Sequence, residues 1–147
     1  AMISQQLGQA ARLDPFAAYL AGLVHDMGTI TLVNLISREA KDANARVSPH
    51  ATVGVVDSMA KELTSLIAAD WGLPASVSEA LADQRRNEPR SALGRLLQEA
   101  HFLSETYLLN HLGLIERDEA EQVRMSVGAP AQLFSRLDDQ VEADCAA

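Results

Sequence analysis

His25 and Asp26 stand side by side near the end of an alanine-rich segment, and this pair has the residue types to do chemistry. An imidazole nitrogen and a carboxylate oxygen can both bind a divalent metal. A bound metal can lower the pKa of a water molecule enough for it to hydrolyse a phosphoester. A catalytic metal usually takes about three protein ligands or more. The pair therefore indicates a metal site only if other parts of the chain supply further ligands.

The same pair also has a structural interpretation, and the residues alone favour it. A histidine in the last turn of a helix can donate to carbonyl groups that lack a partner, and it interacts well with the helix dipole. Asp26 can accept hydrogen bonds from backbone N–H groups where the chain reverses. Gly28 is the expected end of this helix. Both interpretations stay open at this point.

The elements that must position the pair are predicted to be helices. Alanine and leucine are abundant and aromatic residues make up 4% of the chain, a balance that favours helix over strand. Asp14 before Pro15 is a typical helix start, and Ser91 can cap another helix. The expected fold class is all-α, a compact bundle of about 7–8 helices with no convincing strand. The apolar spacing places these helices at about 3–13, 15–27, 29–45, 51–71, 75–84, 91–112, 118–127 and 130–144.

The apolar stripes of these helices predict which residues form the core. The segment from Ile30 to Ile36 is apolar, and we expect it to be buried. The stripe from Leu93 to Leu108 is expected to be core, and less so the dimer interface of a helical adaptor. Trp71 and Pro74 lie at the junction of two helices, where a large tryptophan is expected to be a buried structural anchor. The stripe of the second helix comprises Phe16, Leu20, Leu23, Val24 and Met27.

Length and charge exclude several classes of protein. The 147 residues suit one domain, and the net charge of −8 argues against coating a nucleic acid. The single cysteine, Cys145, cannot form an internal disulfide, which excludes a disulfide-built secreted scaffold. No apolar run approaches the roughly 18 residues that would span a membrane, and no basic-then-apolar leader opens the chain. We therefore expect a cytoplasmic protein that binds neither membrane nor nucleic acid.

The segment Ala21-Gly22-Leu23-Val24-His25-Asp26-Met27-Gly28 resembles the second-helix signature of the HD superfamily. It is most similar to the HDOD domain, the HD-related output domain of bacterial signalling proteins. That family continues with an apolar helix and then a long helix ending in Trp-x-Leu-Pro, which here reads Trp71-Gly72-Leu73-Pro74. Order and spacing agree over about residues 10–112. The resemblance implies an all-α HD/HDOD-type fold and a regulatory role in signal transduction.

The resemblance also implies a metal site, which this sequence completes only in part. Active HD phosphohydrolases carry a histidine upstream of the doublet and an aspartate after it, but no histidine precedes His25. Met59-Ala60-Lys61-Glu62 stands where the family often has Asp-His-x-Glu, and Ala82-Asp83-Gln84-Arg85-Arg86 stands where it commonly has a histidine pair. The remaining histidines do not fall on those positions, and we expect none of them to be a ligand: His50, His101 and His111.

The resemblance bears on domain organisation as well. Only 24 residues precede His25, fewer than in a typical HDOD domain. We expect residues 1–147 to form a single HDOD-like domain, N-terminally truncated or a short form, with residues 113–147 as a C-terminal helical extension. If the beginning of the domain is missing, the exposed apolar face of the remaining helices favours self-association.

Two functional hypotheses follow. The first is a non-catalytic output or regulatory domain without a cofactor. It would act through contacts with a small ligand, a protein partner or a fused signalling domain, with a homodimer as a further option. The alternative is a metal-dependent phosphohydrolase that acts on a nucleotide or cyclic dinucleotide, with three arginines holding the phosphate. The simpler interpretation of those arginines is a solvated loop. The alternative assigns His25 and Asp26, with Asp57 or Asp83, to the metal, and Arg85, Arg86 and Arg90 to the anion.

Overall fold

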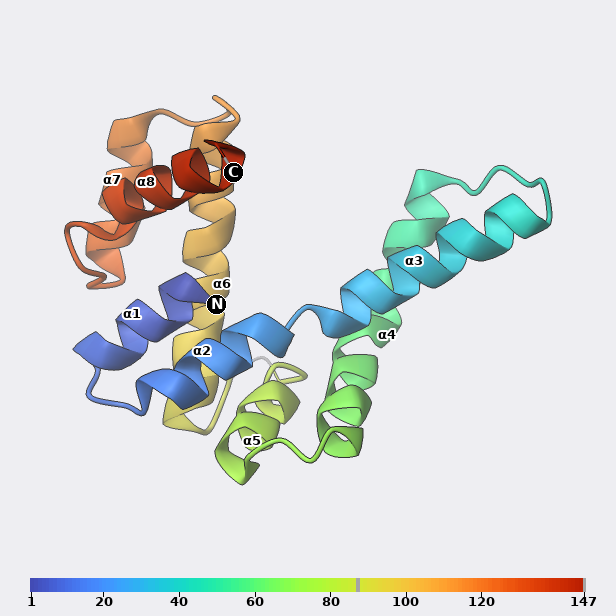
Figure 1. The fold of residues 1–147 in the computed structure, drawn as a ribbon, viewed down its shortest axis with the longest axis horizontal. Coiled ribbons are helices and arrows are strands. Elements are labelled where there is room, and N and C mark those ends of the chain that lie inside the picture. Colours follow the sequence, from blue (N-terminus) through green and yellow to red (C-terminus); the bar gives the residue numbers. More distant parts are fainter. Residues whose placement is uncertain (87, 147) are drawn as a thin grey trace.

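The computed structural model describes residues 1–86 and 88–146, and these residues form eight α-helices and no strand (Figure 1). The predicted all-α fold class is therefore confirmed. The helices are α1 (Met2–Ala10), α2 (Pro15–Val24), α3 (Met27–Asp42), α4 (Pro49–Asp70), α5 (Ala75–Asp83), α6 (Ala92–His111), α7 (Arg117–Ser126) and α8 (Leu133–Ala146).

The helices divide into two parts that Figure 1 shows side by side. We call α3 and α4, residues 27–70, the arm, because this helical hairpin extends away from the rest of the chain. We call the remaining helices, in residues 1–26 and 71–146, the head. In the head, α1 and α2 pack on each other and on α6, while α5 lies between α2, α4 and α6. The arm joins the head where α2 ends and where α5 begins.

The hydrophobic core lies in the head, and α6 runs through it. The predicted stripe on this helix is confirmed as core for its first three turns, from Leu93 to Leu103, whereas Leu108 at its far end is exposed. Helices α5 and α8 complete the core with Leu81 and Phe134. Two predicted caps are also confirmed: the side chain of Asp14 accepts from the N–H of Phe16, and Ser91 Oγ accepts from the N–H of Gly94.

The buried face of helix α2 is not the face that carries its large apolar residues, which were predicted to be buried. Phe16 is 66% exposed and Leu23 53%, so the predicted stripe is wrong for these residues. The small residues of the helix are buried instead, because α1 approaches too closely for large side chains. A Cβ atom at Gly22 would collide with the hydroxyl of Ser4 on α1. The buried residues of α2 are Ala17, Ala18, Ala21, Gly22 and Val24.

The arm contradicts a second prediction. The segment from Ile30 to Ile36 was expected to be buried, yet Ile30 and Leu35 are about half exposed. The physical reason is that α3 packs extensively on α4 alone, so that one face of α3 has a neighbour and the others do not. Gly28 and Leu32 occupy the buried face.

Trp71 is not the buried structural anchor that the sequence predicted, since it is 54% exposed. The chain reverses here because Gly72 adopts a left-handed conformation, with φ of 63°, that favours glycine. Leu73 is the residue of this turn that packs against the core. Pro74 lies at the start of α5, as predicted, and its carbonyl accepts from the N–H groups of Val77 and Ser78.

The segment Pro15–Asp42 is long and apolar enough to cross a membrane by length and composition, with a mean hydropathy of 1.3 in its best window. The expectation that no apolar run approaches this length was therefore wrong. In the structure the segment comprises α2 and α3, and 39% of the window is buried within the protein. The core helix of a soluble protein passes the same test, so the cytoplasmic location stays a prediction.

Candidate functional site

His25 and Asp26 form the junction between head and arm. His25 caps the C-terminus of α2, and Asp26 precedes the first residue of α3. The predicted helix end at Gly28 is wrong, because Gly28 lies in the first turn of α3. A Cβ atom there would collide with the carbonyl oxygen of Ala60 on α4, so the glycine permits the two helices of the arm to touch. Its N–H donates to the hydroxyl of Thr64, 2.9 Å away.

Backbone contacts orient the imidazole of His25. Its Nδ1 lies 2.8 Å from the carbonyl oxygen of Gly22, as a histidine in the last turn was predicted to do. A carbonyl oxygen can only accept, so Nδ1 carries a proton. The other ring nitrogen, Nε2, then faces Oδ2 of Asp26 at 2.9 Å. Asp26 does not cap α3 with its side chain, contrary to expectation, because it pairs with His25 instead.

A third residue, His101, joins the pair from α6. Its Nδ1 lies 3.4 Å from Nε2 of His25, and the two rings meet edge to face. Its own Nε2 lies 3.4 Å from Oε1 of Glu105, one turn further along α6. This carboxylate favours the proton on Nε2, so we assign the lone pair of His101 to Nδ1, which is the atom directed at His25.

The sequence did not predict that His101 would lie beside His25, whereas the expectation that His101 is not a metal ligand stays a prediction. The sequence offered one signal for its position: His101 follows the buried Ala100, at the edge of the α6 stripe. A stripe can show that a residue borders the core, but it does not show which distant residue lies opposite.

His25 Nε2, Asp26 Oδ2 and His101 Nδ1 thus lie close together. Each can offer a lone pair, and lone pairs that face one another are stabilised by a cation between them. One ligand atom from each of His25, Asp26 and His101 lies within 4.8 Å of the others. The cation can be a proton on His25 Nε2, which turns that nitrogen into a donor to Asp26, or a divalent metal. Two imidazoles and a carboxylate suit a first-row transition metal. Gly22 and Glu105 then hold the outer nitrogens of the two rings, as partners of metal-bound histidines commonly do.

The electrostatics of the cluster keep its carboxylate ionised. The hydrogen bond from His25 lowers the pKa of Asp26 below its ordinary value, and a proton shared with the imidazoles beside it would act in the same direction. Partial burial of Asp26 acts in the opposite direction but is outweighed. The cluster therefore presents a negative charge to any cation that enters it.

The structure does not bring the other suggested carboxylates into this cluster. Asp83 is 2% exposed, and its Oδ2 accepts from the N–H groups of Arg90 and Ser91 and from the Ser91 hydroxyl. The pKa of Asp83 is lowered mainly by the hydrogen bonds from Ser91, so this carboxylate clamps the loop between α5 and α6. Asp57 lies on the exposed surface of α4.

The three arginines suggested for anion binding are in that same loop. Arg86 pairs with Asp83 through an Nη1–Oδ1 distance of 3.1 Å, and the carbonyl of Arg90 accepts from Arg95. Arg85 is exposed. Asn87, between them, lies outside the described residues. Their role as anion contacts stays a prediction, and Arg86 would have to leave Asp83 to fulfil it.

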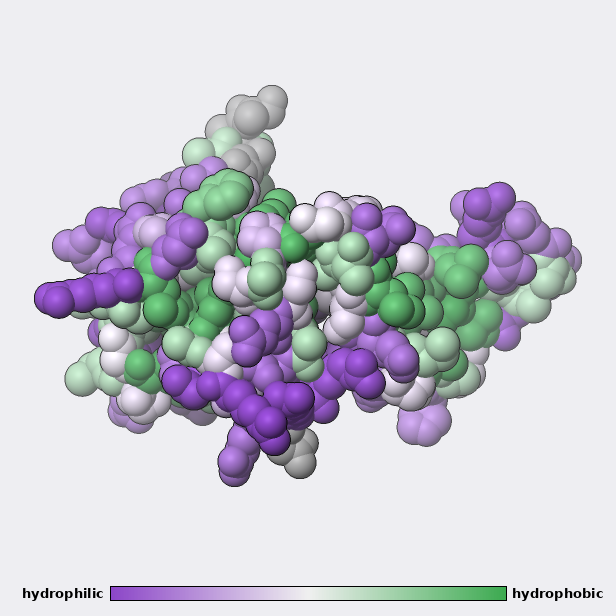
Figure 2. Space-filling view, turned by 90° about the horizontal axis from the view of Figure 1, so that it is seen from below, coloured by the Kyte–Doolittle hydropathy of each residue, from purple (hydrophilic) through white to green (hydrophobic). Residues whose placement is uncertain are grey.

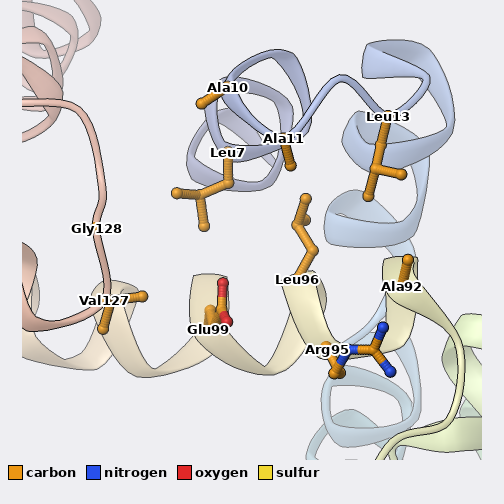
Figure 3. Close-up of a pocket in the computed structure, with 10 residues that line it drawn as sticks. All are labelled: Leu7, Ala10, Ala11, Leu13, Ala92, Arg95, Leu96, Glu99, Val127 and Gly128. Carbon is orange, nitrogen blue, oxygen red and sulfur yellow. The ribbon is translucent and has the colours of Figure 1, made fainter.

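A separate groove of about 350 Å³ opens between α1, α6 and the turn that leads to α8 (Figure 3). Leu7, Leu96 and Val127 supply apolar surface, and the carboxylate of Glu99 points into the space between them. None of the residues that line the groove belongs to the His25 cluster. It is therefore a different feature of the head.

Comparison with known proteins identifies one family. The family model described as HDOD domain matches residues 1–87, more than half of the chain. The match includes α1 to α5 and the pair His25 and Asp26, whereas α6 with His101 follows after it. The resemblance inferred over about residues 10–112 is thus confirmed as to family, with the match beginning and ending earlier. No curated protein and no solved structure matches the chain.

Proposed function

The chain belongs to the HDOD domain family, and from this premise we propose that it is a non-catalytic regulatory domain of bacterial signal transduction. Family membership makes it an output domain of the HD superfamily. The proposal adds that it transmits a signal through contacts with protein, and that it does so in the cytoplasm. The contact surface that we assign is the apolar surface of the arm.

One observation carries this proposal. Among residues 27–70, all of which the structure describes, Leu32 is the one large hydrophobic side chain that is buried. Eight others are exposed, and Figure 2 shows hydrophobic surface gathered on the arm. A large exposed apolar patch commonly marks a site where another protein or a membrane binds. The eight residues are Ile30, Val33, Leu35, Val47, Val53, Val55, Met59 and Leu66.

The His25 cluster supports a structural role within this function. The carbonyl of His25 accepts from the hydroxyl of Thr64 on α4, while its ring contacts Asp26 and His101. These contacts connect the root of the arm to α6 in the head. The pair that resembles a catalytic doublet would thus serve to hold the arm in its orientation.

The test compares the cluster with the arm in cells that lack the native gene. We expect Met59→Glu to abolish the regulatory output and His25→Ala to reduce it only in part, because the backbone contact of residue 25 with Thr64 remains. The purified protein should hydrolyse bis(p-nitrophenyl) phosphate with added Mn²⁺ no faster than an Asp26→Ala variant does. Turnover that depends on both Mn²⁺ and Asp26 would overturn the non-catalytic proposal.

A second candidate function is metal-dependent phosphoester hydrolysis, and the position of His101 favours it. The donor set fits a divalent metal, which His25 Nε2, Asp26 Oδ2 and His101 Nδ1 would hold. When bound, such a metal supplies a water of lowered pKa as the nucleophile. The chain's own part would be to orient both rings through Gly22 and Glu105. The substrate would be a nucleotide or cyclic dinucleotide, with Arg85 and Arg90 near its phosphate.

Metal analysis of the purified protein tests this second function. Stoichiometric Mn²⁺ or Zn²⁺ that is lost in His101→Ala supports it. His111→Ala is the matched control, because His111 is an exposed histidine on the same helix and lies outside the cluster. Equal metal content in the wild type and in both variants, or none in any of them, would remove this candidate.

A further inference from the structure

We propose that the apolar surface of the arm binds the arm of a second copy of this chain. This inference names the partner of the surface on which the proposed function rests. Three properties of the arm carry it: its small internal core, the arrangement of its exposed apolar side chains, and its charge.

The arm has little hydrophobic core of its own. Where α3 meets α4, the buried residues are Gly28 and Leu32 on one helix and small residues on the other. A helix in a protein owes most of its stability to the burial of an apolar face. With Leu32 as its single large buried side chain, the arm gains much of that burial by pairing.

Three of the exposed apolar side chains share a face of α4. Val55, Met59 and Leu66 are separated by four and seven residues, which places them in one row along the helix. Ile30 and Val33, three residues apart, form a shorter row on α3. Rows of this kind let two helices pack along their length, so a helical partner fits them better than a small ligand does.

The size of the arm is sufficient for a dimer. At about 1.5 Å per residue, the 22 residues of α4 extend about 33 Å and the 16 residues of α3 about 24 Å. Two adjacent helices about 10 Å wide then present roughly 600 Å² of projected area. A stable interface of standard size buries about 800 Å² of accessible surface on each partner. The accessible surface of a helix face is larger than its projected area, because side chains make the face uneven. The arm therefore offers close to the roughly 800 Å² that each partner of a stable interface buries.

Charge permits a second copy as the partner and argues against a strongly basic one. The arm carries four basic and five acidic residues, a net charge of −1, which leaves −7 of the chain's −8 on the head. Two copies repel each other through their heads, and the nearly neutral arms are where they can meet. A strongly basic partner would be attracted to the head instead. Contact between arms, with the heads held apart, satisfies both the apolar surface and the charge.

The first experiment measures the mass of the full chain by sedimentation over a wide range of concentration. We expect twice the 15.8 kDa of one chain at high concentration, with dissociation on dilution. Met59→Glu and Leu66→Glu should each weaken the dimer by about tenfold or more, because each places a charge in an apolar contact. Met125→Glu, at a residue of α7 that is 67% exposed, is the control and should leave the dimer unchanged.

Cross-linking locates the contact, and the single cysteine makes it simple. In a Cys145→Ser background, a flexible bis-maleimide cross-linker should join Met59→Cys into a dimer and should not join Met125→Cys. A chain that is monomeric at every concentration would overturn the second copy as partner. So would a dimer that depends on Met125 as strongly as on Met59.

Two further measurements separate this inference from the proposed function. If the chain is monomeric but Met59→Glu reduces the binding of the dye ANS and Met125→Glu does not, the arm remains a contact surface for a different protein. If neither variant changes dye binding, the proposed function falls too. Flotation of the wild type with phosphatidylcholine vesicles, lost in Met59→Glu, would assign the arm to a membrane and overturn both.

Discussion

The head and the arm are built from the same kinds of residue, yet they are held together by different means. In the head, large side chains such as Leu81, Leu97 and Phe134 are almost completely buried. In the arm, apolar side chains of similar size lie on the surface, and α3 and α4 meet through small residues at Gly28 and Ala60. The head is thus stabilised by hydrophobic burial, whereas the arm depends on close backbone contact and on the polar junction at its root.

This difference has a consequence for local stability. Elements with few buried apolar contacts open at lower free energy than the core does. We therefore expect the arm to unfold locally while the head stays folded. The contacts of His25 with Thr64 and His101 are where the two parts are coupled. A ligand or partner that acts on this junction would change the orientation of the arm.

The largest effect should come from a cavity in the head. Leu103→Ala removes a fully buried side chain of α6 and should lower the free energy of unfolding by about 2–5 kcal/mol. Leu66→Ala, on the exposed face of the arm, should change it by less than about 0.5 kcal/mol in the monomer. Urea denaturation at low protein concentration measures both. If both variants lowered the free energy of unfolding by similar amounts, Leu66 would be part of a hydrophobic core, and the contrast between head and arm would be wrong.

A methyl group at the crossing of the arm helices should have the next largest effect. Gly28→Ala forces α3 away from the carbonyl of Ala60 and should cost about 1–3 kcal/mol. Hydrogen exchange should become faster in α3 and α4 and stay unchanged in α6. Gly54→Ala is the matched control, because a Cβ atom there has open space, and this helical substitution should stabilise α4 by roughly 0.5–1 kcal/mol. Faster exchange throughout the head would contradict the separation of the two parts.

Acid should weaken the head through Asp83. The folded-state pKa of this carboxyl lies below its ordinary value of 3.8, so its contribution is present above that pH and is lost as the pH falls through the folded-state pKa. Asp83→Asn should therefore lower the melting temperature at pH 7, by roughly 5 °C, and flatten the decline of stability below pH 4. Thermal melts from pH 7 to pH 2 measure this. An equally steep acid decline in the variant would show that other carboxylates carry it.

The smallest effect should come from Tyr107, which joins α6 to α8. Burial, followed by the hydrogen bond to Asp138, raises the pKa of Tyr107 to about 12. Its stabilisation is therefore complete below the ordinary pKa of 10 and is lost as the pH rises through about 12. Tyr107→Phe should cost about 1 kcal/mol at pH 7 and remove this alkaline step. Ultraviolet titration of the tyrosines tests the value, with exposed Tyr19 as the internal reference.

Much of the local structure was predictable from the sequence. The eight helices, the caps at Asp14 and Ser91 and the core stripe of α6 all follow from periodicity and from capping residues a few positions away. The helix break after Val24 did not follow, because Gly28 resembles a helix end. Gly28 instead allows the backbone of α4 to approach α3 closely. The sequence shows that the residue is a glycine, but it does not show which helix packs against it.

The sequence by itself therefore determined the elements, their apolar rows and the family to which the chain belongs. Tertiary structure alone decided which rows are covered: the row on α6 is buried, and the rows on α3 and α4 are not. It also placed His101 against His25, 76 residues earlier in the chain. The physical reason is that helix periodicity arises from interactions within about four residues. Coverage of a row and contact between distant side chains depend on how whole helices cross.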